Sequence, residues 1–162
     1  MTTGYLASFE PAMSLAIEQA AAVGDTDVPV GAVILDAAGT VLAGASNRRE
    51  ADRDPTAHAE ILAIRAAARS LGDWRLARCT LAVTLEPCAM CAGAILAARL
   101  SRLVYGAVDP RAGAAGSRWD LLHDRELGND IEVVGGVLAD ECAALLRGFF
   151  ERLRKSAADP AG

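Results

Sequence analysis

Residues 80–107 read TLAVTLEPCAMCAGAILAARLSRLVYGA. The first six residues are β-branched or apolar, and they predict a buried strand over Thr80–Leu85. The Ala-rich stretch Cys88–Arg99 predicts a helix that begins at the corner formed by Pro87, and a second strand is expected over Leu103–Ala107. Strands that alternate with helices in this way are typical of an α/β domain.

The same alternation extends in both directions along the chain. Helical spacing of apolar residues predicts three more helices, the first with Ser8 as its N-cap: Phe9–Val23, Thr56–Ser70 and Asp140–Lys155. Short apolar runs predict further strands, of which the first two form a hairpin: Val30–Leu35, Val41–Ser46 and Ile131–Val134. A Gly/Ala-rich loop is expected over 109–117 and a short helix near Trp119–His123. These elements indicate one α/β domain of two or three layers with a mixed sheet.

The composition indicates a protein with one hydrophobic core. The chain has 162 residues, of which 52% are hydrophobic, and this length suits a single domain. Its apolar runs are too short for a membrane span, and residues 1–10 lack the basic start of a signal peptide. Two of the four cysteines form a Cys-x-x-Cys pair, which points to metal binding in a reducing compartment. We therefore expect a cytoplasmic protein with no membrane partner.

The net charge of −5 is unevenly distributed. Residues 1–46 contain five acidic side chains and no Lys or Arg, whereas the rest of the chain holds 16 basic and 16 acidic groups. Basic residues are locally in excess over 99–118 and over 147–155. A local basic stripe matters more for nucleic-acid binding than the overall charge, so the charges permit a polyanionic partner without establishing one.

Two short motifs carry the chemistry: His58-Ala59-Glu60, and Pro87-Cys88-Ala89-Met90-Cys91. Zinc binds His nitrogen and Cys sulfur in a tetrahedral shell, and catalytic sites use three protein ligands and leave the fourth position to water. His58, Cys88 and Cys91 provide three such ligands. Because two thiolates already neutralise the dication, Glu60 is free to carry protons, as zinc-assisted hydrolysis requires.

Two other kinds of site could contain these motifs. A closed structural zinc site would need a fourth donor from His123, Cys79 or Cys142. The two cysteines lie where lone cysteines are usually buried apolar side chains, and His123 lies in an expected surface turn. A redox Cys-x-x-Cys would leave the His58-x-Glu60 spacing without a purpose. The open catalytic site is therefore favoured.

The pair H-x-E and P-C-x-x-C is the signature of zinc nucleobase deaminases. Beyond it, roughly residues 8–155 resemble the bacterial tRNA-specific adenosine deaminases. The segments that carry the resemblance are Val28–Val33, Asn47-Arg48, Asp54–Glu60, Thr84–Cys88, Met90–Ala94, Gly113–Ser117 and Leu138–Leu146. This breadth is far more specific than the zinc motif, which cytidine, guanine and riboflavin-pathway deaminases share.

The resemblance implies a fold, a cofactor and a reaction. The fold is a three-layer α/β/α cytidine-deaminase-like domain over residues 1–155 with a central mixed five-stranded sheet, and we expect 156–162 to be a disordered tail. One Zn²⁺ per subunit is implied, with His58, Cys88 and Cys91 as ligands and Glu60 as the proton shuttle. The implied reaction converts adenosine to inosine at wobble position 34 of a tRNA anticodon and releases ammonia. The implied partners are the tRNA anticodon stem-loop and a second copy in a homodimer.

The resemblance also suggests substrate-binding residues. Asn47 would contact the base, with Val30 and Ala59 as walls; from the sequence alone Asn47 reads as a turn residue. Asp109 would face the nucleotide, or is a solvated loop acid, while Glu86 is expected to be structural. A surface for the anticodon stem-loop is suggested by Phe149-Phe150 together with Arg147, Arg152 and Arg154. An amphipathic helix whose basic residues complement its C-terminal dipole fits these residues nearly as well.

Two rival functions remain open. A deaminase of a free base or nucleoside, such as guanine or cytosine, would not need the basic residues near the C-terminus. A catalytically silent RNA-binding protein with structural zinc would not need Glu60. The chain also departs from the group at 109–112, where Pro110 and Ala112 stand in place of residues that often include a Lys.

Overall fold

The computed structural model describes residues 3–127 and 131–158. The helices are α1 Thr3–Ala7, α2 Glu10–Ala21, α3 Ala59–Leu71, α4 Ala89–Ala97 and α5 Ala139–Ala158. The strands are β1 Gly31–Leu35, β2 Val41–Ser46, β3 Thr80–Leu85, β4 Arg102–Ala107 and β5 Glu132–Gly135. Every strand predicted from the sequence is present within one or two residues of its expected bounds.

The strands form one five-stranded mixed sheet in the order β2-β1-β3-β4-β5. β1 pairs antiparallel with β2 and with β3, while β3, β4 and β5 run parallel to one another. β1 and β2 are the predicted hairpin, in which Gly31 lies opposite Ser46. The expected mixed sheet of five strands is confirmed.

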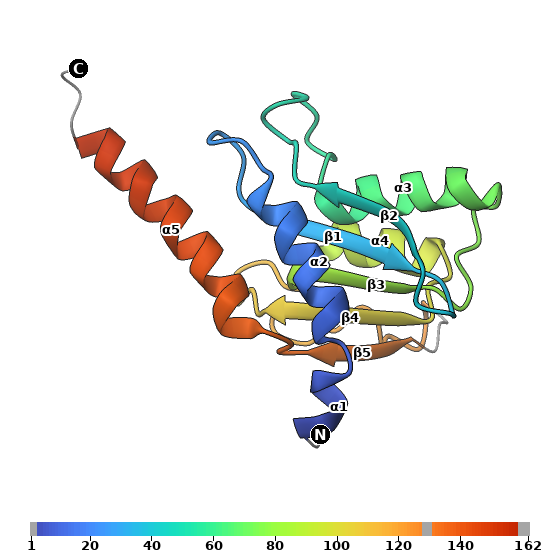
Figure 1. Ribbon diagram of the computed structural model, residues 1–162. Coiled ribbons are helices and arrows are strands. Elements are labelled where there is room, and N and C mark those ends of the chain that lie inside the picture. Colours follow the sequence, from blue (N-terminus) through green and yellow to red (C-terminus); the bar gives the residue numbers. More distant parts are fainter. Residues whose placement is uncertain (1–2, 128–130, 159–162) are drawn as a thin grey trace.

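Helices cover both faces of the sheet, which makes the three layers that were expected (Figure 1). α3 and α4 pack on one face, where Ile34, Leu81, Val83 and Leu103 of the strands meet alanines of α3 and Ile95 of α4. α2 and α5 lie on the other face, whose core contains alternate residues of the same strands together with Met13. This alternation follows from the two-residue period of a strand, which sends successive side chains to opposite faces.

Helix α2 lies very close to β1. A Cβ atom on Gly31 would come within 2.1 Å of the carbonyl oxygen of Ala16 and 2.3 Å of the amide nitrogen of Ala20. Only glycine permits this approach, so Gly31 holds α2 against the start of β1. The loop that joins them, residues 22–30, is thereby held at the end of the sheet where α3 and α4 begin.

The first helix boundary differs from the prediction. Ser8 is not the N-cap of α2; its hydroxyl donates to the carbonyl oxygen of Tyr5, 2.7 Å away, and α2 begins at Glu10 after Phe9. The reason is the short helix α1, which the sequence pattern did not predict. Its residue Tyr5 provides the carbonyl that accepts the Ser8 hydrogen bond.

The predicted short helix near Trp119–His123 is wrong. In that segment Asp120 forms an isolated β-bridge with Ala115, and the amide of Leu121 donates to the carbonyl of Ala114 at 3.1 Å. These bonds fold the segment back on the preceding loop, and the fully buried side chain of Leu122 anchors it. Pairing with residues 114 and 115 of the preceding loop has replaced the hydrogen bonds between residues four apart that a helix would need.

Helix α5 is longer than expected and leaves the body of the protein. It continues to Ala158, three residues into the expected tail of 156–162, and residues 159–162 lie outside the described residues. Figure 1 shows its C-terminal half projecting away from the sheet, and residues 150–158 are exposed. Over the described ranges, the structure contains no helix long and apolar enough to cross a membrane.

Candidate active site

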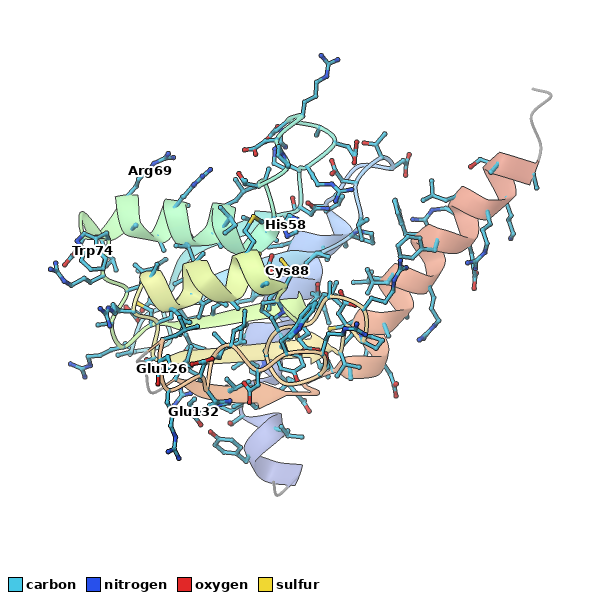
Figure 2. All side chains as sticks on the ribbon, turned by 180° about the vertical axis from the view of Figure 1, so that it is seen from behind. His58, Arg69, Trp74, Cys88, Glu126 and Glu132 are labelled. Atoms are coloured by element: carbon cyan, nitrogen blue, oxygen red, sulfur yellow. The ribbon has the colours of Figure 1, made fainter. Side chains whose placement is uncertain are left out.

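The three predicted metal ligands meet at the starts of two helices. His58 is the N-cap of α3 and Cys88 the N-cap of α4, both with extended backbone, and Cys91 lies one turn into α4. Figure 2 shows His58 and Cys88 next to each other at adjacent helix ends. The Nδ1 atom of His58 lies 3.8 Å from the sulfur of Cys88 and 3.5 Å from that of Cys91.

These distances suit a zinc ion. Zn–S bonds of about 2.3 Å and Zn–N bonds of about 2.05 Å at tetrahedral angles separate nitrogen from sulfur by about 3.6 Å. The potential ligand atoms of His58, Cys88 and Cys91 all lie within 4.8 Å of one another, and no fourth His, Cys, Asp or Glu among the described residues joins them. Three ligands with a fourth position left over are what a catalytic zinc site has. The closed site with His123, Cys79 or Cys142 as the fourth ligand is therefore not supported.

Charge in this cluster is concentrated on Cys88. Hydrogen bonds from Cys91 and from His58 lower the pKa of the Cys88 thiol to about 4. The pKa of Cys91 is raised, first by its hydrogen bond to Cys88 and then by burial, and the hydrogen bond to Cys88 raises the pKa of His58. The group is thus ready to bind a cation through an existing thiolate, and helix N-termini favour that negative charge further.

Glu60 lies beside this cluster in the first turn of α3. Its side chain is 4% exposed, and burial raises the pKa of its carboxyl. Residues two apart on a regular helix do not share a face. His58 and Glu60 nevertheless face the same pocket, because His58 is extended and only Glu60 is helical. A buried carboxyl whose pKa is raised accepts a proton more readily than an exposed one, as a general base must.

A cavity of about 180 Å³ opens next to the metal ligands. It is smaller than the ~300–1,000 Å³ that take a drug-sized molecule, so it suits a single base. All four residues predicted to surround a base line it, together with His58, Glu60 and Cys88: Val30, Asn47, Ala59 and Asp109. Arg49 also lines it and was not anticipated, because nothing in the sequence distinguishes it from other exposed arginines.

Asn47 joins two segments of the cavity wall. Its Nδ2 donates to the carbonyl of Val28 at 3.1 Å, and its Oδ1 accepts the amide of Arg49 at 3.3 Å. An amide side chain has two N–H groups and two acceptor lone pairs, so it has capacity left for a purine edge.

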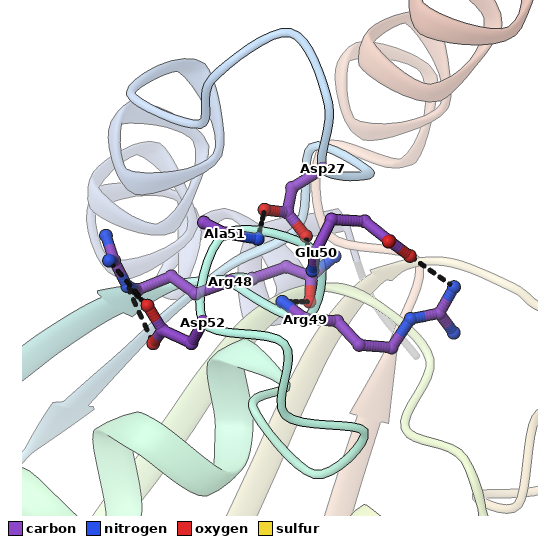
Figure 3. A network of polar contacts seen from close by, with 7 residues as sticks. Asp27, Arg48, Arg49, Glu50, Ala51 and Asp52 are labelled. Atoms are coloured by element: carbon purple, nitrogen blue, oxygen red, sulfur yellow. Dashed lines mark hydrogen bonds and ion pairs between the residues drawn. The ribbon is translucent and has the colours of Figure 1, made fainter.

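A buried carboxylate that the sequence analysis missed holds the same rim. Asp27 is 3% exposed and accepts the backbone amides of Glu50 at 2.7 Å and Ala51 at 3.0 Å (Figure 3). Since its partners are main-chain groups more than twenty residues away, no side-chain pattern could have identified it. Asp27 fixes the loop from which Asn47 and Arg49 reach the cavity.

On the opposite rim, Asp109 folds back on its own loop. Its Oδ1 accepts the amides of Arg111 at 2.9 Å and Ala112 at 3.1 Å. Glu86, expected to be structural, is buried and accepts three backbone amides of the same loop. Burial by itself would raise the pKa of Glu86, but the hydrogen bond of the Ser117 side chain and those of the three amides together lower it.

The residues predicted on α5 lie outside the base cavity. Phe149 is buried and lines a second hollow of about 600 Å³ that adjoins the base cavity at Val28, Asn47 and Arg49. Phe150, suggested together with Phe149, is 44% exposed and lines the same hollow. Arg147 and Arg152 are exposed, and Arg152 borders another hollow on the far side of Phe149.

The family model for the cytidine and deoxycytidylate deaminase zinc-binding region matches residues 7–107. The chain belongs to the cytidine and deoxycytidylate deaminase family. Among curated members, the tRNA-specific adenosine deaminase of Haemophilus influenzae is 47% identical over 129 residues, which are 80% of this chain and 75% of that protein. The Bacillus subtilis protein of the same name is 46% identical over 129 residues, 80% of each chain.

Solved structures of deaminases share the fold. A chain from studies of A-to-I editing by tRNA:A34 deaminases at the wobble position of transfer RNA has a TM-score of 0.80 and 42% identity, covering 84% of this chain and 99% of that one. A guanine deaminase from Nitrosomonas europaea has a TM-score of 0.71 and 27% identity, covering 89% of this chain and 83% of that one. The deaminase fold therefore extends well beyond the matched zinc-binding region, and the relatives act on more than one base.

Proposed function

We propose that this protein is a zinc-dependent tRNA adenosine deaminase that converts adenosine 34, at the wobble position of an anticodon, to inosine. The observation that carries the proposal is a base-sized cavity lined by Glu60, Asn47 and two of the three clustered metal ligands, His58 and Cys88. The relatives named tRNA-specific adenosine deaminase, at 46–47% identity, support adenosine in tRNA over other substrates.

His58, Cys88 and Cys91 would hold one zinc ion per subunit. When bound, zinc supplies a Lewis acid that makes water nucleophilic near neutral pH. The rest of the chemistry falls to the protein side chains around the cavity.

Glu60 accounts for the proton movements. As the water oxygen forms a bond to C6 of adenine, Glu60 accepts one of its protons and passes it to ring N1. Glu60 then moves the second proton of the water to the exocyclic nitrogen, the C6–N bond breaks, and ammonia leaves. The product keeps a carbonyl at C6 and a proton on N1, which is inosine, so one carboxylate serves as base and then as acid.

The cavity walls would hold the base for this attack. Asn47 has hydrogen-bonding capacity beyond its two backbone contacts, and Val30 and Ala59 provide apolar or backbone contacts. Asp109 lies on the opposite wall, although its Oδ1 already accepts two amides of its own loop.

Bases in an anticodon loop can be splayed out at low cost, which is why such loops are frequent targets of sequence-specific RNA recognition. The hollow next to the base cavity would take a neighbouring nucleotide, with exposed Phe150 available for stacking. Arg147, Phe149 and Arg152 belong to the same helix, so α5 is our candidate for contact with the anticodon stem-loop.

We further propose a homodimer that acts in the cytoplasm. A groove between α3 and α4 is lined mainly by apolar side chains, among them Ile64 and Trp74, and Trp74 is 54% exposed. Exposed apolar patches of this kind mark interaction sites, and a second copy would cover this one. All four cysteines are free thiols, which fits a reducing compartment.

The test is to incubate the protein with a synthetic anticodon stem-loop that carries adenosine at position 34 and to analyse its nucleosides by mass spectrometry. We expect inosine at position 34 and none in a control stem-loop whose only loop adenosine is at another position. Free adenosine, guanine and cytosine are assayed in parallel for ammonia release. Ammonia from a free base with no inosine in RNA would instead establish the rival free-base deaminase.

A further inference from the structure

Glu86 is a buried residue next to the metal site that has no role in the proposed reaction. It comes directly after β3 and precedes Pro87 and the zinc ligand Cys88, and its side chain is only 2% exposed. Both carboxylate oxygens are engaged by backbone amides from one distant loop. Oε2 accepts the amide of Asp109 at 3.0 Å, and Oε1 accepts those of Ala115 at 3.1 Å and Ser117 at 3.0 Å.

This loop, residues 109–117, forms one wall of the base cavity through Asp109 and Ala112. It is also bonded to the main chain beside the metal ligand. The amide of Ala114 donates to the carbonyl of Pro87 at 2.8 Å, and Gly113 forms a β-bridge with Cys88. The loop is therefore attached at two places, to the Glu86 carboxylate and to the start of the zinc-binding segment.

The loop is shaped around the carboxylate. A Cβ atom on Gly113 would come within 2.4 Å of Cδ and Oε2 of Glu86 and of Oγ of Ser117, so no larger residue fits there without displacing the carboxylate or the loop around it. A buried carboxylate that accepts several amides is also one of the stronger hydrogen-bonding arrangements available to a loop. The loop is thus held by a buried charged side chain and a close glycine contact, which most surface loops lack.

We propose that Glu86 is a positioning residue for the deamination, which fixes the 109–117 loop so that Asp109 and Ala112 stand at a set distance from Glu60 and the metal ligands. The inference rests on the proposed function, because the wall it positions is the wall of the base cavity. Glu86 also lines the cavity, but both of its carboxylate oxygens already accept amides of the loop, so its proposed action is through the loop.

Glu86→Gln tests the inference, since the carboxamide keeps the size of the side chain but turns an NH₂ group toward amides that need an acceptor. The zinc content is expected to stay at the wild-type value. The KM for the adenosine-34 stem-loop should rise about tenfold, as expected when a hydrogen bond to a charged group is lost, while kcat changes less than about threefold. Amide hydrogen exchange should show faster exchange at Asp109, Ala115 and Ser117 than in wild type.

A second variant reaches the same contact from the other side. Gly113→Ala leaves the Glu86 charge intact but pushes the loop away from it, and it should give the same rise in KM and the same faster exchange. Gly4→Ala is the matched control, because a Cβ there meets nothing within 4 Å. If both variants break one contact, the double variant Glu86→Gln with Gly113→Ala should be little worse than either alone.

A purely stabilising role would predict a different pattern. Leu76→Val weakens the core at the opposite end of β3, where Leu76 is fully buried. If this variant raises KM as much as Glu86→Gln at an equal loss in Tm, positioning by Glu86 is refuted. An unchanged KM together with a loosened loop refutes it as well.

Should wild type deaminate a free base and not RNA, the same variants are compared on that base. Failure of the proposed function and failure of this inference are therefore separate results.

Discussion

At the scale of single residues, Glu60 is buried next to three metal-binding side chains but is not one of the ligands. Proton transfer and metal binding therefore depend on different residues. The carboxyl of Glu60 is 4% exposed, yet it does not belong to the ligand cluster of His58, Cys88 and Cys91. Glu60→Gln should therefore lower kcat by about 10²- to 10⁴-fold, the usual contribution of general acid–base catalysis. Zinc content, measured by mass spectrometry of the metal, should be unchanged. Glu18→Gln, an exposed change on α2, serves as the control, and loss of zinc along with activity would make Glu60 a ligand instead.

The same scale shows why some site residues were predictable and others were not. His58, Glu60, Cys88 and Cys91 could be found because their chemistry resides in their own side chains at a recognisable spacing. Asp27 could not be found, and the contacts of Glu86 could not be foreseen, because both bind backbone amides of loops that lie 23 to 31 residues further along the chain. Main-chain groups are the same at every position, so the sequence carries no mark of such partners.

At the scale of elements, α5 presents two adjacent aromatic rings with different environments. Phe149 is 4% exposed, whereas Phe150 is 44% exposed and lies edge-on to it, with ring centroids 5.3 Å apart. Phe149→Ala should lower the free energy of unfolding by about 3 kcal/mol, as for other buried aromatic residues. Phe150→Ala should leave Tm nearly unchanged but weaken stem-loop binding by about 1–3 kcal/mol, the value of one stacked base. Thermal unfolding and a binding titration with the same RNA separate the two effects. Equal loss of binding in both variants, in proportion to Tm, would contradict a stacking role for Phe150.

Elements with strong local patterns were predicted well from the sequence. The β1–β2 hairpin has a turn at Asp36, whose Oδ1 accepts the amides of Ala38 and Thr40, and this is the local chemistry that the Asp36–Gly39 segment indicates. The helix predicted around Trp119 is absent because the amides of Trp119 and Leu121 donate to the carbonyls of Gly113 and Ala114, which are further back than the four residues of a helical hydrogen bond. The spacing of apolar residues does not distinguish a short helix from a loop that folds back on itself in this way.

At the scale of the whole molecule, the site lies where two chain segments meet: the one that joins β3 to α4 and the one that joins the β1–β2 hairpin to α3. α4 follows β3 directly, so its N-terminus lies at the carboxyl end of the parallel β3–β4 pair, while α3 arrives there from the β1–β2 hairpin. The alternation of strands and helices predicted a mixed sheet, but not its order. Adjacent strands such as β1 and β3 are separated by the whole of β2 and α3, and only packing decides that they pair.

From the exposed groove between α3 and α4 we predict that two copies of the chain form a dimer. Its apolar lining includes Ile61, Ile64, Ala68 and Trp74, and burying such a surface against an identical copy would stabilise a two-fold dimer. Light scattering after gel filtration should therefore give wild-type protein a mass twice that of the 16.8 kDa chain. Trp74→Glu would place a charge in the interface and should shift the mass to that of one chain, because burying an unpaired carboxylate costs several kcal/mol. Val41→Glu, at another exposed apolar residue on the edge strand β2, should leave the dimer intact. A monomeric wild type, or a dimer that Trp74→Glu does not weaken, would show that this groove is not the interface between copies.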